Sequence, residues 1–174
     1  MENSSKPIVS LTNLEQAGFV VQDAEKSAEK LWDTFGIGPW AISQLIPELL
    51  ENASYHGKPT SFTIRVAMTQ SKIGTMQLEL IEPLEGDSTY HDFLRENGEG
   101  LHHFGWVRLS SLEEFNVTTL VLENAGFPCV MNGRISRLGV MAYFDTTRVL
   151  NAMLEVVCDD PAPQLPPIDR VIPG

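Results

Sequence analysis

The sequence GLHHFGW, at residues 100–106, places two adjacent histidines in an otherwise apolar run. A short run of this kind predicts a β-strand, in which successive side chains point to opposite faces of the sheet. His103 therefore shares a face with Gly105, whereas His102 points the other way. Alternation alone does not say which histidine carries chemistry, so the choice between them requires a second copy of the pattern.

A second copy lies near the N-terminus, in the segment EQAGFVV at residues 15–21. Its alignment with HHFGWVR places Gln16 opposite His103 and a glycine opposite a glycine. The later segments LELIE and LEVVC align in the same way and place Glu79 opposite Glu155. Each half thus offers one polar residue in its first strand and one glutamate in its last. The repeat selects His103, and we expect His102 to be a packed residue hydrogen-bonded near the site.

The aligned segments belong to two copies of one element order. In each copy, hydrophobic periodicity and glycine or proline breaks predict a strand, a helix and three strands. We therefore expect an α+β fold, with a first βαβββ module at residues 12–84, a linker helix at 85–99 and a second module at 100–158. The tail at 159–174 contains five prolines, and we expect it to be an extended arm or disordered.

Composition narrows the possible partners and compartments. The chain has 174 residues, 43% of them hydrophobic, and a formal net charge of −11, which argues against nucleic acid and anionic membranes as partners. It has two cysteines without metal or disulfide spacing, and no apolar stretch of the roughly 18 residues that a membrane span needs. We expect a soluble, cytoplasmic protein that acts on a small molecule.

The aligned polar residues are unusual because both glutamates lie in apolar strands. A carboxylate in such a place is costly unless it is paired or binds a metal. Two glutamates, an imidazole and an amide suit a divalent cation, which gives a candidate ligand set of Gln16, Glu79, His103 and Glu155. The alternative, left open here, is that each residue is separately ordinary, with the glutamates paired to arginines such as Arg65.

At these residues the chain resembles the vicinal oxygen chelate superfamily, which includes glyoxalase I, methylmalonyl-CoA epimerase, extradiol dioxygenases and bleomycin-resistance proteins. The resemblance covers residues 12–158. It is closest to the epimerase-like branch through LELIEPLEGDSTYHDFLRENGEGLHHFGW, with FGIGPW upstream and NAMLEVV downstream. It implies two βαβββ modules that form an open, U-shaped mixed sheet around a central cleft, the four metal ligands named above, and a homodimer.

Two positions depart from the epimerase pattern. Epimerases of this kind usually have histidine at the first ligand position and often glutamine at the second, whereas this chain has Gln16 and Glu79, as in eukaryotic glyoxalase I. They also carry a second catalytic glutamate on the third strand of the first module, but residues 60–72 contain no acidic side chain. A symmetric two-base reaction therefore lacks its second base at that position.

The resemblance implies a metal-dependent isomerase, either an epimerase or a racemase, that acts next to a carbonyl group. A divalent metal (Co, Zn, Mn, Ni or Mg) would stabilise charge on the carbonyl oxygen, and Glu155, with Glu79, would serve the proton transfer. The substrate would be an acyl-CoA thioester or an apolar aromatic ketone. We expect the substrate to contact the larger apolar side chains near the site, namely Trp40, Phe62, Met68, Trp106 and Tyr143.

Two other functions remain as alternatives. One is a metal-free small-molecule binding protein of the bleomycin-resistance type, because one fold hosts many functions. The other is an extradiol-type dioxygenase, whose iron needs two histidines and one carboxylate. Gln16 stands where the first of those histidines would be, and this disfavours the dioxygenase.

Overall fold

A computed structural model of the chain describes residue 9 and residues 14–173, apart from the side chains of residues 106 and 107. The first half contains β1 (Leu14–Val20), α1 (Ala24–Phe35), β2 (Trp40–Leu45), a 3-10 turn (Pro47–Leu49), β3 (Leu50–Tyr55), β4 (Lys58–Pro59), β5 (Thr63–Thr69) and β6 (Gln77–Glu85). The connecting helix is α2 (Thr89–Asn97). The second half contains β7 (Gly100–Arg108), α3 (Leu112–Asn124), β8 (Cys129–Ile135), β9 (Gly139–Phe144), α4 (Thr147–Leu150) and β10 (Met153–Asp159), and β11 (Ile168–Ile172) follows.

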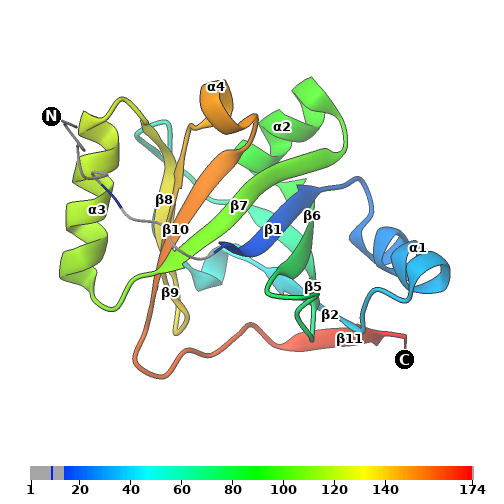
Figure 1. The fold of residues 1–174 in the computed structure, drawn as a ribbon. Coiled ribbons are helices and arrows are strands. Elements are labelled where there is room, and N and C mark those ends of the chain that lie inside the picture. Colours follow the sequence, from blue (N-terminus) through cyan, green and yellow to red (C-terminus); the bar gives the residue numbers. More distant parts are fainter. Residues whose placement is uncertain (1–8, 10–13, 174) are drawn as a thin grey trace, which may run out of the picture.

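All the strands belong to one mixed sheet, in the order β11-β2-β5-β6-β1-β7-β10-β9-β8-β3-β4. At its centre, β1 and β7 pair antiparallel, and each pairs on its other side with the parallel last strand of its half, β6 or β10. Figure 1 shows α1 and α3 at opposite ends of the molecule, where α1 packs on β5 and β6 and α3 packs on β10. The predicted α+β class is confirmed.

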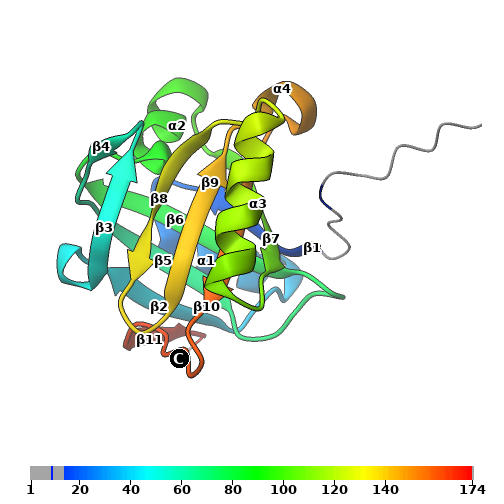
Figure 2. The ribbon, with the colours of Figure 1, turned by 90° about the vertical axis from the view of Figure 1, so that its left-hand side faces the viewer.

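The sheet is strongly curved, and Figure 2 shows β8 and β9 in front of β5 and β6. One apolar cluster fills part of the space between the two arms, with Ile64 and Val66 of β5 and Met131 and Met141 of β8 and β9. Burial of these side chains joins the two halves into one folding unit. Among the described residues, no helix is both long and apolar enough to cross a membrane.

Short-range signals in the sequence determine where the helices begin and end. Asp23, Ser88 and Ser111 precede α1, α2 and α3, and each side chain accepts a backbone N–H of the first turn. Gly36 ends α1 with a φ of 67°, a left-handed conformation that glycine adopts without steric cost.

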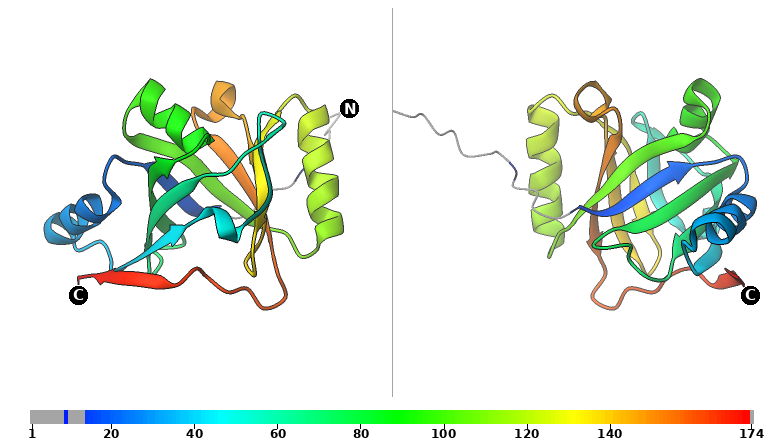
Figure 3. Two further views of the ribbon diagram at one scale, coloured as in Figure 1. Left: turned by 180° about the vertical axis from the view of Figure 1, so that it is seen from behind. Right: turned by 45° about the vertical axis from the view of Figure 1, so that its right-hand side comes forward.

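The tail agrees with the expected extended arm rather than with disorder, and part of it is an ordered strand that the sequence analysis did not predict. Residues of β11 pair antiparallel with β2, with Ile172 opposite Trp40, and Figure 3 shows the C-terminal segment running beneath the sheet to reach this edge. The prolines lie outside Ile168–Ile172, so they remove no donor from the ladder. Without β11, β2 would be an edge strand with unpaired backbone groups.

This contact predicts that the tail stabilises the fold. Ile172 is 3% exposed and packs in a cluster with Trp40, whereas Ile168 in the same strand is 52% exposed. We expect Ile172→Ala to lower the free energy of unfolding by about 2 kcal/mol through lost burial and the cavity it leaves. Ile168→Ala is the matched control, with an expected change below about 0.5 kcal/mol. Urea denaturation measures both, and equal effects of the two substitutions would contradict the prediction.

Candidate functional site

The four central strands bring the candidate ligands into two adjacent rows. Because β6, β1, β7 and β10 are neighbours, residues in register lie side by side on one face of the sheet. One row contains Glu79, Gly18, His103 and Met153, and the next contains Gln77, Gln16, Gly105 and Glu155. The two halves of the repeat thus meet at the β1–β7 pair, and all four candidate ligands lie within these two rows.

Two glycines make room for two of these side chains. A Cβ atom on Gly18 would lie 1.9 Å from Cε1 of His103, and a Cβ atom on Gly105 would lie 2.6 Å from Oε1 of Gln16. The imidazole therefore lies against the backbone of β1, and the amide lies against the backbone of β7. The sequence alignment had placed Gly18 opposite Gly105, but pattern alone did not show that each accommodates a ligand side chain of the facing strand.

His103 is completely buried, with its Nε2 atom between two carboxylates. This nitrogen lies 3.5 Å from Oε2 of Glu79 and 3.7 Å from Oε2 of Glu155. It has no hydrogen-bond partner within the described structure. A buried polar atom without a partner is rare in folded proteins and calls for an explanation such as a bound ion.

The same surroundings change the affinity of these groups for protons. Burial raises the pKa of Glu155, and the charge of Glu79 adds to this, while His103 and the Tyr143 hydroxyl act in the opposite direction. For His103, burial alone would lower the pKa, but the two nearby carboxylates outweigh it, so the pKa is raised. Without a cation, the cluster therefore retains protons that isolated groups would release.

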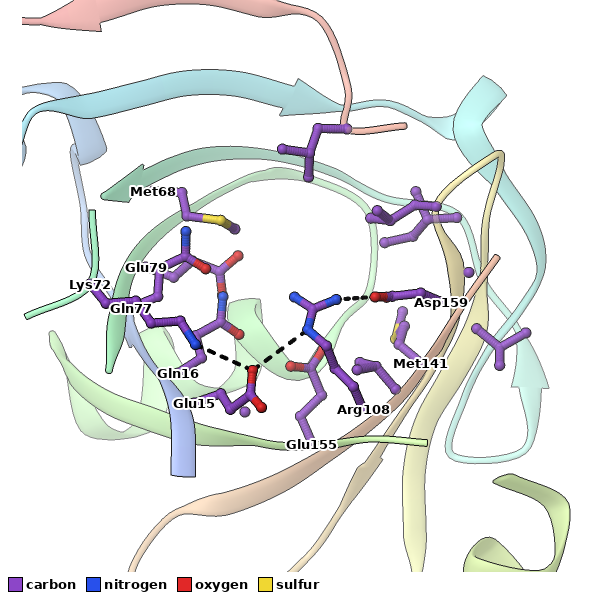
Figure 4. Close-up of a pocket in the computed structure, with 17 residues that line it drawn as sticks. Glu15, Gln16, Met68, Lys72, Gln77, Glu79, Arg108, Met141, Glu155 and Asp159 are labelled. Carbon is purple, nitrogen blue, oxygen red and sulfur yellow. Dashed lines mark hydrogen bonds and ion pairs between the residues drawn. The ribbon is translucent and has the colours of Figure 1, made fainter. Parts of the chain in front are cut away.

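Glu79, Glu155 and Gln16 reach a cavity of about 250 Å³. Figure 4 shows these three side chains pointing into it, together with Met68 and Met141. The remaining apolar wall comes from β8, the β8–β9 turn, β9, β10 and the tail, at Ile135, Leu138, Val140, Val157 and Leu165. The cavity thus joins a polar floor to an apolar wall, an arrangement typical of small-molecule sites.

A chain of ion pairs borders the same cavity. Glu15 lies 3.5 Å from Nζ of Lys72 and 3.7 Å from Nε of Arg108, and Arg108 also pairs with Asp159 (Figure 4). All four residues line the cavity and are at least partly exposed. The sequence analysis did not identify them, because their spacing along the chain carries no recognisable motif.

The residues expected to contact substrate fall into different places. Met68 lines the cavity. Trp40 and Phe62 do not, because Trp40 packs under α1 and donates its Nε1–H to the Ile37 carbonyl, and Phe62 packs in the core. Tyr143 lies behind the site, with its ring centroid 5.1 Å from that of His103. The side chain of Trp106 lies outside the described residues.

The donor set fits a divalent cation. The described residues contain no ready-made cluster of three His, Cys, Asp or Glu ligands. However, metal–ligand bonds of about 2.1 Å place neighbouring ligand atoms roughly 3.0–3.4 Å apart, and the two His103–glutamate distances, 3.5 and 3.7 Å, are only slightly longer. The unpartnered nitrogen between two carboxylates is what such an ion would satisfy, with Gln16 as a further oxygen donor.

Comparison with known proteins identifies relatives and solved structures with a similar fold. The uncharacterized protein YqjC of Bacillus subtilis is 48% identical over 44 residues, a match that covers 25% of this chain and 30% of that relative. Two solved methylmalonyl-CoA epimerases have similar folds. A variant of the Streptomyces coelicolor enzyme, in complex with 2-nitronate-propionyl-CoA, has a TM-score of 0.61 at 20% identity and covers 86% of this chain and 99% of its own. The Mycobacterium tuberculosis enzyme has a TM-score of 0.60 at 20% identity, with 87% and 90% covered.

A hypothetical protein of Bacillus halodurans has the same fold, with a TM-score of 0.62 at 17% identity and 88% and 98% of the two chains covered. The family model described as the Glyoxalase/Bleomycin resistance protein/Dioxygenase superfamily matches residues 15–144, which include the first half of the repeat, the second half up to and including β9, and three of the four candidate ligands. The resemblance inferred from the sequence is thus confirmed, and this chain belongs to that superfamily, also known as the vicinal oxygen chelate superfamily.

Proposed function

We propose that this protein is a metal-dependent isomerase, an epimerase or racemase, that removes and returns a proton next to a substrate carbonyl. The observation that carries the proposal is the unpartnered Nε2 atom of His103, buried between Glu79 and Glu155 at the polar end of an apolar cavity. Gln16, Glu79, His103 and Glu155 would hold the cation, whose identity among Co, Zn, Mn, Ni and Mg the donor set leaves open. When bound, the cation supplies a Lewis acid for the carbonyl oxygen.

The proton transfer is assigned to Glu155. Its carboxylate reaches the cavity beside the polar floor, where a positioned carboxylate accepts a proton from a substrate carbon and returns it. Glu79 lies on the other side of His103 and completes the charge balance for a divalent ion. The apolar walls border the carbon that loses its proton, and Glu155, which exchanges its proton with solvent between transfers, returns a proton to the same carbon or to its neighbour.

The cavity favours a substrate with a small apolar group next to its carbonyl. A volume of about 250 Å³ accommodates a short acyl group or one aromatic ring. The rest of a larger substrate would extend past Lys72 and Arg108, which would bind the phosphates of an acyl-CoA thioester only in place of their present partners, Glu15 and Asp159. The complex of the Streptomyces coelicolor epimerase supports the acyl-CoA class, and an apolar aromatic ketone is the other class.

A metal-free binding protein of the bleomycin-resistance type is the second candidate. It is favoured by the apolar cavity wall and by the lack of a ready-made cluster of three ligands among the described residues. An extradiol-type dioxygenase fits less well, because Gln16 is not one of the two histidines that its iron requires. Assembly as a homodimer and a cytoplasmic location stay predictions from the sequence.

The metal content of the protein distinguishes the first two candidates. We expect tag-free protein, purified without chelator, to contain close to one equivalent of divalent metal by mass spectrometry, and Glu79→Ala and His103→Ala to contain none. His56→Asn replaces an exposed histidine and is the matched control, with unchanged metal content. Metal-free wild-type protein that takes up neither Co nor Zn would overturn the isomerase proposal and favour the binding protein.

A further inference from the structure

Behind His103, a line of buried polar atoms leads away from the cavity. The Nδ1 atoms of His102 and His103 lie 3.1 Å apart, and Nε2 of His102 lies 3.1 Å from Oγ1 of Thr89. The Thr89 hydroxyl in turn donates to Sδ of Met153 at 3.2 Å. Both histidines are 0% exposed and Thr89 is 2% exposed, so these contacts are shielded from bulk water. Each polar atom in the line therefore relies on its neighbour in the line, rather than on water, for a hydrogen bond.

Two directions of hydrogen bonding are possible along this line. The contact between the two Nδ1 atoms requires a proton on one of them, since two bare nitrogens would repel each other. In the first direction, His103 donates to His102, His102 donates from Nε2 to Thr89, and the Thr89 proton needs another acceptor. In the second direction, Thr89 donates to His102, His102 donates from Nδ1 to His103, and a neutral His103 then carries its proton on Nε2.

Met153 distinguishes the two directions. A thioether sulfur only accepts hydrogen bonds, and its contact with the Thr89 hydroxyl uses the one proton that the second direction would send to His102. The sulfur is in place because Met153 on β10 pairs in register with His103 on β7. Sδ of Met153 is therefore the acceptor that the Thr89 hydroxyl needs in the first direction. In the second direction the hydroxyl donates to His102 instead, and Sδ has no role.

The rings around His102 hold it in this orientation. Tyr90, Phe93 and Tyr143 surround it, with ring centroids 5.0, 5.3 and 5.8 Å from that of His102. Among the described residues, its ring nitrogens have no hydrogen-bond partners other than His103 and Thr89. A rotated His102 ring would lose both of these contacts, so the ring orientation is fixed. With the ring fixed, the direction of the hydrogen bonds depends on where the Thr89 hydroxyl sends its proton.

We propose that Thr89, His102 and Met153 are positioning residues that fix the tautomers of the histidine pair. His102 carries its proton on Nε2 and accepts from Nδ1–H of His103, which leaves Nε2 of His103 free of internal hydrogen bonds and directed between Glu79 and Glu155. The gain in affinity for a bound cation rests on the proposed function. The tautomer of His102 is independent of that function and is tested separately. Substitution of a residue that hydrogen-bonds to a metal ligand typically changes metal affinity by about 10–100-fold.

Nitrogen NMR of the full-length protein, labelled with ¹⁵N-histidine, tests the tautomers directly. The chain has four histidines. His56→Asn and His91→Asn identify two of the signals by their loss, and His103→Asn separates the signals of His102 and His103. We expect His102 to be protonated on Nε2 and bare on Nδ1 in both the metal-free and the zinc-loaded protein. A His102 protonated on Nδ1 in the wild type would overturn the proposal.

Substitution of Thr89 separates positioning from simple packing. Thr89→Val keeps the shape but removes the hydroxyl, and we expect His102 to change to the Nδ1–H tautomer and zinc affinity to fall by about 10–100-fold. Thr89→Ser should restore both, whereas Thr118→Val, at a buried threonine of α3, should change neither. An unchanged His102 tautomer in metal-free Thr89→Val would overturn the proposal; the metal-free protein is required because zinc on Nε2 of His103 by itself places the His103 proton on Nδ1. The expected tautomers in a protein that binds no metal would support the proposal while contradicting the isomerase function.

Discussion

Glu155→Gln is expected to slow solvent hydrogen exchange at the substrate α-carbon by about 10²–10⁴-fold, the usual contribution of a positioned base. Glutamine keeps the size of the side chain and an oxygen that a metal can bind, but it cannot accept the proton. Deuterium incorporation in D₂O, followed by mass spectrometry on acyl-CoA thioesters and aromatic ketones, measures the effect. Circular dichroism and metal content of the same samples show whether the fold and the metal site persist.

The control for this experiment is Glu48→Gln, which changes an exposed glutamate of the 3-10 turn that is not among the cavity-lining residues. It should exchange hydrogen at the wild-type rate. A Glu155→Gln protein with normal exchange and bound metal would show that another group removes the proton. Glu79 would then be the next candidate, because its carboxylate lies close to the same Nε2 atom of His103 and reaches the same cavity.

Gly18→Ala should disrupt the site from the neighbouring strand. The added methyl group would lie 1.9 Å from the His103 ring, which is held on its other side by His102 and Tyr143. Either the ring or β1 must shift, and overpacking of this kind costs about 1–3 kcal/mol of the free energy of unfolding. We expect a loss of this size in urea denaturation, together with the loss of bound metal.

Gly100→Ala is the matched control, since Gly100 is also a strand glycine and an added methyl group would meet only Phe93, at 3.9 Å. Its stability and metal content should stay close to those of the wild type. If Gly18→Ala were as stable as Gly100→Ala and bound metal equally well, His103 could not lie against β1 as the structure shows. This test does not require knowledge of the substrate.

Much of the fold was predictable because it is encoded in local periodicity and in a repeat. The matches of Gln16 with His103 and of Glu79 with Glu155 placed four polar side chains in the central strands, and the register brings them into adjacent rows. The choice of His103 over His102 followed from the same repeat. These inferences depended on strand alternation. Alternation is interrupted at His102, where the register shifts from His103 opposite Gly18 to Leu101 opposite Phe19, and the His102 ring lies against His103 instead of on the opposite face.

Other features depended on packing between distant segments. Alternation assigns the side chains of β2 to two faces of the sheet but does not say which face borders the cavity. The structure shows that Trp40 lies on the other face and packs under α1. The pairing of β11 with β2 joins segments more than a hundred residues apart, and the sequence of the tail suggested only an extended arm. The contact between Thr89 and Met153 likewise spans 64 residues and has no local signature.

The pairing of β11 with β2 has a consequence for folding during synthesis. The strand that completes the outer edge of the first half is translated after both halves, so β2 leaves the ribosome long before its partner exists. Until then its backbone is open to pairing with other nascent chains. Chaperone dependence and misassembly should therefore concentrate in the interval between translation of β2 and translation of Ile168–Ile172, rather than at the boundary between the two repeats.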